Sequence, residues 1–382
     1  MDVNLNCKIA KKCNSCQLNN LNYEEQLKFK FNKCIKFLGS YNRIEPVIAM
    51  ENPFSYRNKA QAVFKRERDK SISWGLYKST TNTLVKTREC KLHTKHSNEI
   101  FNTLCALFKS FKIAPFDPFK GTGFIKSVVI REGFTSGEVM VIINGADPIF
   151  PAKKTFVSAL IKKHPYITTV VTTVNKDRRK LFTGKTQDVL FGDGYIKDTL
   201  CDKTFIISPQ SFYQINPVQT KKLYEKAIEL AQLNGTQTVL DAYCGVGTIG
   251  ICACDKAKKV YAVESVKDAI IDAKKNAKIN KISNINFVCA DAKDYIETLK
   301  NENVNIDVAF VDPPRAGCSK EFLNSVIDMQ IKTLVYISCN IETQSRDLHL
   351  LKQNGYKVEH IQPVDMFPHT NHIECIALIK KQ

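Results

Sequence analysis

The carboxyl-terminal half of the sequence alternates between helix-like and strand-like segments, and this alternation constrains the fold more than any other feature. From about residue 217, segments with helical spacing of apolar side chains are separated by short runs rich in Val, Ile and Ala. The expected helices are 218–232, 248–256, 266–278, 319–329 and 342–354. The expected strands are one ending at Asp241, then 259–263, 286–290, 307–311 and 333–338, with closing strands near 356–361 and 373–380. This order predicts an α/β fold with a doubly wound, mostly parallel sheet, whose ligands bind beyond the carboxyl ends of the strands.

The amino-terminal half has a different character and is expected to form a separate, mixed β-rich domain. Segments 124–131, 137–143 and 167–174 have strand composition, with Gly or charged residues between them. We therefore expect one domain over 1–205 and a second over 206–382.

The charge of the chain is concentrated in that first half. The formal net charge is +18, of which residues 1–200 carry +17 and residues 201–382 carry +1. A generally lysine-rich proteome would raise both halves, whereas a polyanion that docks on one half explains the asymmetry. The stretch 52–64 adds aromatic side chains to Arg57 and Lys59, a combination that suits RNA but also occurs on ordinary sheets.

Three strand ends carry residues typical of a nucleoside site. The turn Asp241–Thr248 holds two glycines that allow close backbone approach to a ligand. Glu264 stands 17 residues beyond Gly247, where an acidic side chain can accept hydrogen bonds from ribose hydroxyls. Asp291 ends the next strand, in a position to meet an adenine edge. The loop lacks the third glycine of the dinucleotide fingerprint, which favours S-adenosylmethionine over NAD.

The fourth strand ends in Asp312-Pro313-Pro314-Arg315. Consecutive prolines cannot pair within a sheet, so they fix a rigid exit from the strand. Amino-group methyltransferases have a related element that is followed by an aromatic residue. Arg315 at that place argues against methylation of an exocyclic nitrogen.

The fifth strand ends at Cys339, and the last strand begins near Glu374. Each could be ordinary, Cys339 as a small buried side chain and Glu374 as a solvated carboxylate. Together they suit methylation of uracil C5, a weak nucleophile. Addition of a thiolate to C6 makes C5 reactive, and a base then removes the C5 proton.

These motifs resemble those of the bacterial RNA 5-methyluridine methyltransferases, especially the members that act on 23S ribosomal RNA. The resemblance covers nearly the whole chain. It is carried by Phe212-Tyr213-Gln214-Ile215-Asn216, Asp241-Ala242-Tyr243-Cys244-Gly245, Asp312-Pro313-Pro314-Arg315, Ser338-Cys339-Asn340 and His372-Ile373-Glu374.

The resemblance implies a Rossmann-like S-adenosylmethionine-dependent methyltransferase domain that follows an RNA-binding domain. It implies that Cys339 is the nucleophile and Glu374 the base. The residues that would bind S-adenosylmethionine are Gln214, Tyr243, Glu264 and Asp312, together with Thr248 and Asp291, where some members have other polar residues.

Four amino-terminal cysteines form a possible metal site. Cys7, Cys13 and Cys16 follow the pattern C-x5-C-x2-C, and Cys90 stands apart from them. Four thiolates can hold zinc or an iron–sulfur cluster. The resemblance implies a [4Fe-4S] cluster, which the ribosomal members carry and the transfer-RNA members lack. Cys34 is a less favoured alternative ligand.

Two other functions stay open from the sequence: a transfer-RNA 5-methyluridine methyltransferase and a non-catalytic iron–sulfur RNA-binding protein. No run of about 18 apolar residues occurs, so no membrane-spanning segment is expected. The first residues have no apolar segment of the kind that a secretory signal needs, so a cytoplasmic location is expected.

Overall fold

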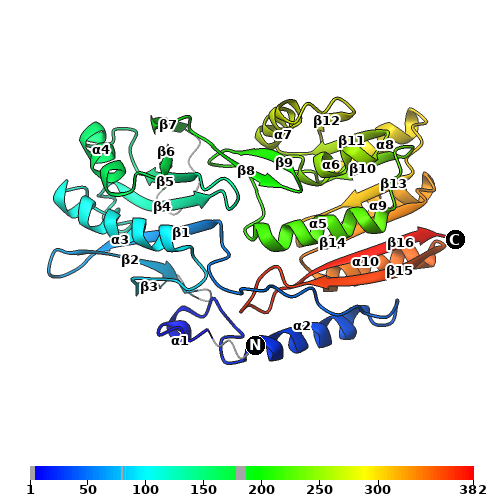
Figure 1. Cartoon of the computed structure of the whole chain (residues 1–382), viewed down its shortest axis with the longest axis horizontal. Helices are drawn as coiled ribbons and strands as arrows, with labels where there is room; N and C mark the ends of the chain where they lie inside the picture. The colour runs from blue at the N-terminus through cyan, green and yellow to red at the C-terminus, as the bar shows by residue number, and fades with distance from the viewer. Residues whose placement is uncertain (1–4, 79–80, 82, 178–185) are drawn as a thin grey trace.

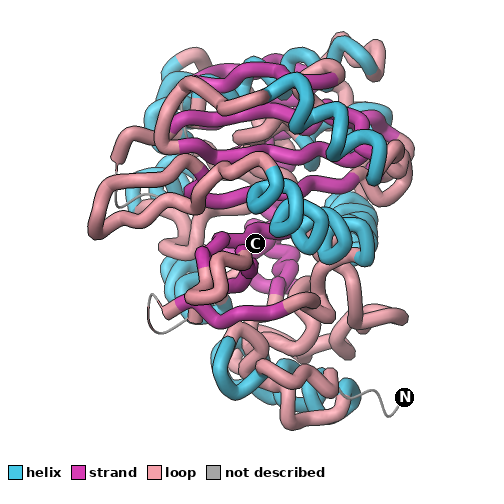
Figure 2. Tube along the Cα trace, turned by 90° about the vertical axis from the view of Figure 1, so that its left-hand side faces the viewer, coloured by secondary structure: helices cyan, strands magenta, loops and turns pink. Residues whose placement is uncertain are grey.

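The computed structural model describes residues 5–78, 81, 83–177 and 186–382. Within this part, the strands form two seven-stranded sheets and one two-stranded hairpin (Figure 1). Each sheet occupies one half of the molecule, and the segment that carries α1 (Ala10–Cys13) and α2 (Tyr23–Leu38) lies below them (Figures 1 and 2). In the described residues, no helix is long and apolar enough to cross a membrane.

The carboxyl-terminal sheet has the strand order β12-β11-β10-β13-β14-β16-β15. Its strands are β10 (Thr238–Ala242), β11 (Lys259–Glu264), β12 (Ile285–Cys289), β13 (Val308–Val311), β14 (Thr333–Ser338), β15 (Tyr356–Val364) and β16 (Glu374–Lys381). The first five are parallel, and β16 inserts antiparallel between β14 and β15. The prediction of a doubly wound α/β sheet is confirmed.

Helices cover both faces of this sheet. One face packs against α5 (Pro217–Ala231), α6 (Thr248–Ala253) and α7 (Lys267–Ile279) in a single apolar core. The other face packs against α8 (Ala292–Asn301), α9 (Lys320–Asp328), α10 (Ile341–Gln353) and the amino-terminal helix α2. Of these, α8 and α2 are the helices that the sequence pattern did not predict.

The amino-terminal sheet has the order β3-β2-β1-β4-β5-β6-β7 and is mixed, because β5 and β6 are parallel. Its strands are β1 (Lys59–Arg66), β2 (Ile72–Tyr77), β3 (Leu84–Thr87), β4 (Ile125–Glu132), β5 (Val139–Gly145), β6 (Ile167–Val174) and β7 (Thr186–Phe191). Helices α3 (Lys95–Ser110) and α4 (Lys153–Lys163) share a core with one face. Side chains of the other face join the core around α5, together with the hairpin of β8 (Ile196–Leu200) and β9 (Lys203–Ile207).

The amino-terminal residues therefore do not all pack with the amino-terminal sheet. Helix α2 contacts α10 and β15 of the second sheet. An Asn22–Glu25 capping box, in which each side chain accepts from the other's backbone N–H, fixes the start of α2. The expected boundary between a domain 1–205 and a domain 206–382 stays a prediction. Helix α2 belongs to the range 1–205 but packs on the sheet of the range 206–382.

The winding of the carboxyl-terminal sheet determines where a ligand can bind. Strand β10 pairs with β11 on one side and with β13 on the other. The helices α6 and α7, which lead from β10 to β12, lie on one face of the sheet, and α8, which leads to β13, lies on the other. A gap between the following loops opens at such a switch point. The chemistry is thus expected where β10 and β13 end.

Candidate active site

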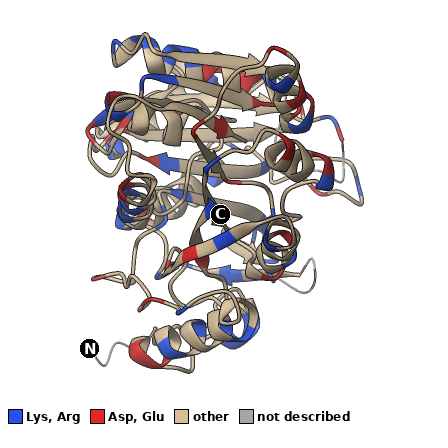
Figure 3. Cartoon of the chain, turned by 90° about the vertical axis from the view of Figure 1, so that its right-hand side faces the viewer, with Lys and Arg blue, Asp and Glu red and all other residues tan. Residues whose placement is uncertain are grey.

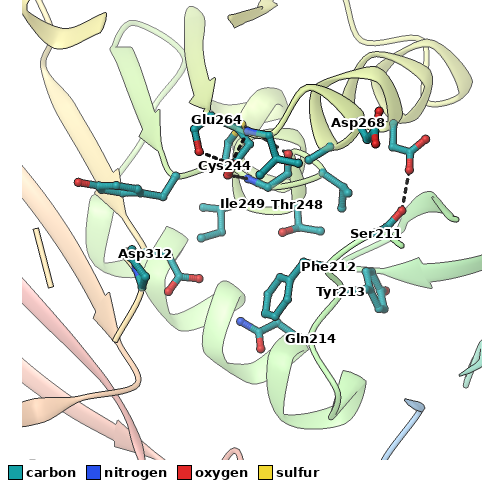
Figure 4. Close-up of a pocket in the computed structure, with 18 of the residues that line it drawn as sticks. Ser211, Phe212, Tyr213, Gln214, Cys244, Thr248, Ile249, Glu264, Asp268 and Asp312 are labelled. Atoms are coloured by element: carbon teal, nitrogen blue, oxygen red, sulfur yellow. Dashed lines mark hydrogen bonds between the residues drawn. The ribbon is translucent and has the colours of Figure 1, made fainter. Parts of the chain in front are cut away.

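A cavity of about 1080 Å³ lies at the carboxyl ends of β10, β11, β13 and β14. All eight residues that the sequence nominated for catalysis or cofactor binding line this cavity. They are Gln214, Tyr243, Thr248, Glu264, Asp291, Asp312, Cys339 and Glu374. Figure 4 shows Phe212 and Gln214 on the side of the cavity opposite Glu264.

The turn after β10 forms one wall. Tyr243 has a φ of 65°, an uncommon conformation for a residue with a side chain. Gly247 has a φ of 82°, and a Cβ atom there would approach the Phe287 ring to 2.9 Å. Glycine is therefore needed at 247 for both conformation and space.

Glu264 is held in place by backbone donors. Its Oε2 accepts a hydrogen bond from Gly245 N at 3.2 Å, and its Oε1 accepts one from Val266 N at 2.9 Å. The Ser265 hydroxyl also donates to Oε1, at 3.2 Å. A carboxylate has about four acceptor positions, so these bonds fix its direction and still leave room for a hydroxyl donor.

Thr248 and Asp291 also have structural partners. The Thr248 hydroxyl lies 3.1 Å from the hydroxyl of Tyr224 on α5. Asp291 is the N-cap of α8, where its Oδ1 accepts from Lys293 N at 3.0 Å. Both residues can face a ligand, but each has a role in the fold without one.

The opposite wall is the segment 208–214, which follows the hairpin. Phe212 is 67% exposed, and the Ser211 hydroxyl donates to Asp272 Oδ2 of α7 at 2.6 Å. Ser211 and Asp272 are site residues that the sequence analysis missed. They are 61 positions apart, and no local pattern links them.

Strand pairing brings Cys339 and Glu374 together. In the antiparallel ladder of β14 and β16, Ser338 lies opposite Cys375. Continuing this register by one position places Cys339 opposite Glu374. Glu374 is 3% exposed, so its carboxyl group is almost completely removed from bulk water.

The environment changes the acidity of the groups in this part of the cavity. Burial, followed by the charges of Glu374 and Asp312, raises the pKa of Cys339 to about 11, while Arg315 opposes the shift. Burial raises the pKa of Asp312 to about 7. Burial and then Asp312 raise the pKa of Glu374 well above its usual value, again against Arg315. Without a ligand, the Cys339 thiol is therefore protonated at neutral pH.

A second cavity, of about 410 Å³, is lined by Cys7, Cys13, Cys16 and Cys90. Burial, followed by the neighbouring charge of Cys90, raises the pKa of Cys16 to about 12. Cys34 is fully buried in the core between α2 and the second sheet, and it does not line this cavity.

The four thiols are a donor set that fits zinc or an iron–sulfur cluster, since both are held by cysteine thiolates. Over the described ranges, however, no group of three or more His, Cys, Asp or Glu side chains is arranged so that it could hold a metal ion. The thiols share a cavity without converging on one point. Arg57 and Lys59 also line it, half-buried, so their expected contact with RNA stays a prediction.

The fold is that of an S-adenosylmethionine-dependent methyltransferase. Its parallel sheet is wound in two directions, its last strand is inserted antiparallel, and an acidic pocket lies at the switch point. The family model for tRNA (uracil-5-)-methyltransferases matches residues 181–382. The chain belongs to this family and is an RNA methyltransferase.

Similar proteins agree with this assignment. An RNA methyltransferase of Bacillus cereus is 38% identical over 98% of this chain and 82% of its own length. One of Caldanaerobacter subterraneus is 39% identical over 99% of this chain and 84% of its own length. The crystal structure of the Pyrococcus abyssi tRNA (uracil-54, C5)-methyltransferase with S-adenosyl-L-homocysteine has a TM-score of 0.80 and 29% identity, and covers 95% of this chain and 85% of that one.

The raised pKa of Cys339 predicts how the free enzyme reacts with iodoacetamide. Only the thiolate is nucleophilic, so the alkylation rate at Cys339 should rise about tenfold per pH unit above neutrality and level off near the pKa. Peptide mass spectrometry over a pH series would measure this rate, with the exposed Cys289 as an internal comparison. If Cys339 were alkylated quickly at pH 7 and the rate did not rise at higher pH, the raised pKa of Cys339 would be contradicted.

Proposed function

We propose that the protein transfers a methyl group from S-adenosylmethionine to C5 of a uridine in 23S ribosomal RNA, through a covalent bond between Cys339 and C6. The observation that carries this proposal is the β14–β16 register, which sets Cys339 opposite Glu374 in the cavity that holds the nominated cofactor residues. A thiol and a buried carboxyl group at one edge of a pocket are the two groups that the chemistry of uracil C5 requires.

The nominated side chains would bind S-adenosylmethionine along the switch point. Glu264, fixed by Gly245 and Val266, would accept hydrogen bonds from the ribose hydroxyls, and Asp291 would meet the adenine. Gln214, Tyr243, Asp312 and Thr248 would complete the site. The bound S-adenosyl-L-homocysteine in the Pyrococcus abyssi enzyme supports this use of the cavity. S-adenosylmethionine supplies the electrophilic methyl group.

The protein's own groups account for the remaining steps. The Cys339 thiolate adds to C6, and the displaced electron pair makes C5 nucleophilic. After C5 is methylated, Glu374 removes the C5 proton, and the returning electron pair expels the Cys339 thiolate. Burial suits Glu374 to this task, because a carboxylate with a raised pKa is a stronger base. Arg315 lowers the pKa of Cys339 and so favours the attacking thiolate.

The preference for ribosomal RNA rests on the four-cysteine pattern and on the basic amino-terminal half. Seen from the methyltransferase side, basic and acidic positions are interspersed (Figure 3), in keeping with the +1 charge of residues 201–382. The excess of +17 lies in residues 1–200, which would therefore make most of the phosphate contacts. A cytoplasmic location forms part of the proposal, because that is where ribosomal RNA is modified in bacteria.

The proposal includes a [4Fe-4S] cluster in the second cavity, held by Cys7, Cys13, Cys16 and Cys90, with zinc as the alternative. The shared cavity supports it, and binding would draw the four thiols toward a common centre. Methyl transfer needs no electrons, so the cluster would stabilise the local structure rather than take part in the reaction.

The catalytic assignment predicts different failures for the two residues. Cys339→Ala should form no covalent complex and transfer no methyl group. Glu374→Gln should still attack and methylate, then stall as an RNA–protein adduct that survives a denaturing gel. Radiolabelled S-adenosylmethionine would show whether the trapped RNA carries the methyl group. An adduct with Cys339→Ala, or normal turnover with Glu374→Gln, would show that the residues are wrongly assigned.

The cluster assignment predicts a brown protein after anaerobic purification. Cys16→Ser should bleach the colour and lower the iron content, whereas Cys289→Ser, at an exposed cysteine elsewhere, should change neither. Metal analysis of the purified protein would distinguish the two metals. A colourless protein with one zinc ion would refute the cluster and leave the methyltransferase proposal intact.

The substrate assignment predicts which RNA loses 5-methyluridine in a deletion strain. The modified nucleoside should disappear from one or more positions of 23S ribosomal RNA and persist in transfer RNA. Mass spectrometry of separated ribosomal and transfer RNA would measure both. Loss from transfer RNA alone would favour the transfer-RNA alternative, in line with the substrate of the Pyrococcus abyssi enzyme.

A further inference from the structure

A buried ion pair connects the amino-terminal helix α2 to the loop before β16. The Lys30 ammonium lies 2.5 Å from Asp365 Oδ1, and both side chains are 0% exposed. The same ammonium donates to the carbonyl of Phe367 at 3.0 Å, and the Tyr23 hydroxyl donates to Asp365 Oδ2 at 2.8 Å. Lys30 thus binds two points of the loop at once.

Other amino-terminal residues hold the next part of the same loop. His369 N donates to Gln26 Oε1 at 2.9 Å, and the His369 carbonyl accepts from Leu18 N at 3.1 Å. The Tyr56 hydroxyl donates to the Pro368 carbonyl at 3.1 Å. Residues more than 300 positions earlier in the chain therefore hold positions 365 to 369 in their conformation.

This loop leads directly to the proposed base. Asp365 follows Val364, the last residue of β15, and Val364 is the strand partner of Glu374. Further along, Phe367 and His372 line the catalytic cavity together with Glu374. Asp365, the partner of Lys30, is thus the next residue after Val364, which pairs with Glu374.

The type of interaction suits positioning better than general stabilisation. Burial lowers the pKa of Lys30, and the Asp365 charge opposes that shift. A buried ion pair contributes little net stability compared with well-packed apolar side chains, since both charges must leave water. Its hydrogen bonds are directional, however, so it fixes where the loop lies.

We propose that Lys30 is a positioning residue for Glu374: its contacts with Asp365 and Phe367 fix the loop 365–373 and thereby hold the Glu374 carboxyl group where it can take the C5 proton. This inference rests on the proposed function. Attack by Cys339 comes from β14, whereas the hydrogen bonds of Lys30 go to Asp365 and Phe367 of the loop, so loss of Lys30 should slow proton removal more than adduct formation.

The test compares Lys30→Met with Lys28→Met, a matched change at an exposed lysine of the same helix. With substrate RNA and labelled S-adenosylmethionine, Lys30→Met should accumulate a methylated, denaturation-resistant adduct. Its turnover should fall about a hundredfold, as expected when a catalytic group is displaced by roughly 1 Å. Its affinity for S-adenosylmethionine should not change, and Lys28→Met should behave as wild type.

A second variant guards against loss of folding, because Lys30→Met leaves Asp365 buried without its cation. Lys30→Met/Asp365→Asn removes both charges, and the amide oxygen that replaces the carboxylate can still accept from Tyr23. The double variant should fold, as judged by thermal melting, and it should also accumulate the adduct. Wild-type turnover in the double variant, or a slow variant with no methylated adduct, would overturn the inference.

Glu374→Gln, run in parallel, separates this inference from the proposed function. If Glu374→Gln accumulates the adduct and the folded Lys30 variants do not, the positioning role is wrong and the base assignment stands. If Glu374→Gln itself shows no adduct, the proposed mechanism fails.

Discussion

The insertion of β16 between β14 and β15 is the constraint on which the active site depends. All residues of β16 are buried except its last two, and it pairs with β14 over six positions and with β15 over eight. A strand that is paired on both sides cannot slip easily, because a shift of one residue would exchange the side chains that pack in the two apolar cores. The same ladder that anchors the strand therefore fixes the backbone of Glu374 relative to that of Cys339.

Placing acidic groups at such a buried edge has an electrostatic consequence. Asp312 and Glu374 lose their hydration, which raises the pKa of both, and the Asp312 charge adds to the shift at Glu374 while Arg315 opposes it. Each of these carboxyl groups therefore keeps its proton to a higher pH than it would in water. Burial and then the charges of the same carboxyl groups raise the pKa of Cys339, so protonation of the acids and ionisation of the thiol favour each other. Burial thus couples the titration of Cys339 to that of Glu374.

The sequence could predict the parts of this arrangement that depend on local pattern. Strand β14 runs over 333–338 and β6 over 167–174, as expected, because their short length and their β-branched residues favour a strand over a helix. The strand ends then placed Cys339 and Glu374 at one pocket. Helix α8 was missed although Ala292, Tyr295, Ile296 and Leu299 form an apolar stripe after the Asp291 cap. From the sequence alone, Asp291 is interpreted only as a ligand residue.

Helix α2 shows why other parts could not be predicted. Its buried face includes Gln26 and Lys30 beside Tyr23, Cys34 and Leu38, so the apolar spacing of an amphipathic helix is interrupted. These polar residues are buried because their partners, His369 and Asp365, come from the far end of the chain. No local pattern contains that information. The same is true of the four cysteines, whose shared cavity depends on packing between the α1 segment and Cys90.

The cofactor pocket also depends on contacts between the two halves. The buried guanidinium of Arg131, on β4, donates to the carbonyls of Ser208 at 2.5 Å and Ser211 at 2.6 Å. The Asn58 side chain donates to the Gln214 carbonyl at 3.0 Å. These bonds come from β4 and from the residue before β1, and they hold the wall that carries Phe212 and Gln214. Removing their donors would leave several carbonyls of that wall without partners, which is costly for buried groups. The methyltransferase sheet supplies the acids and the thiol, but the amino-terminal half shapes the opposite side of the pocket, so the site belongs to both.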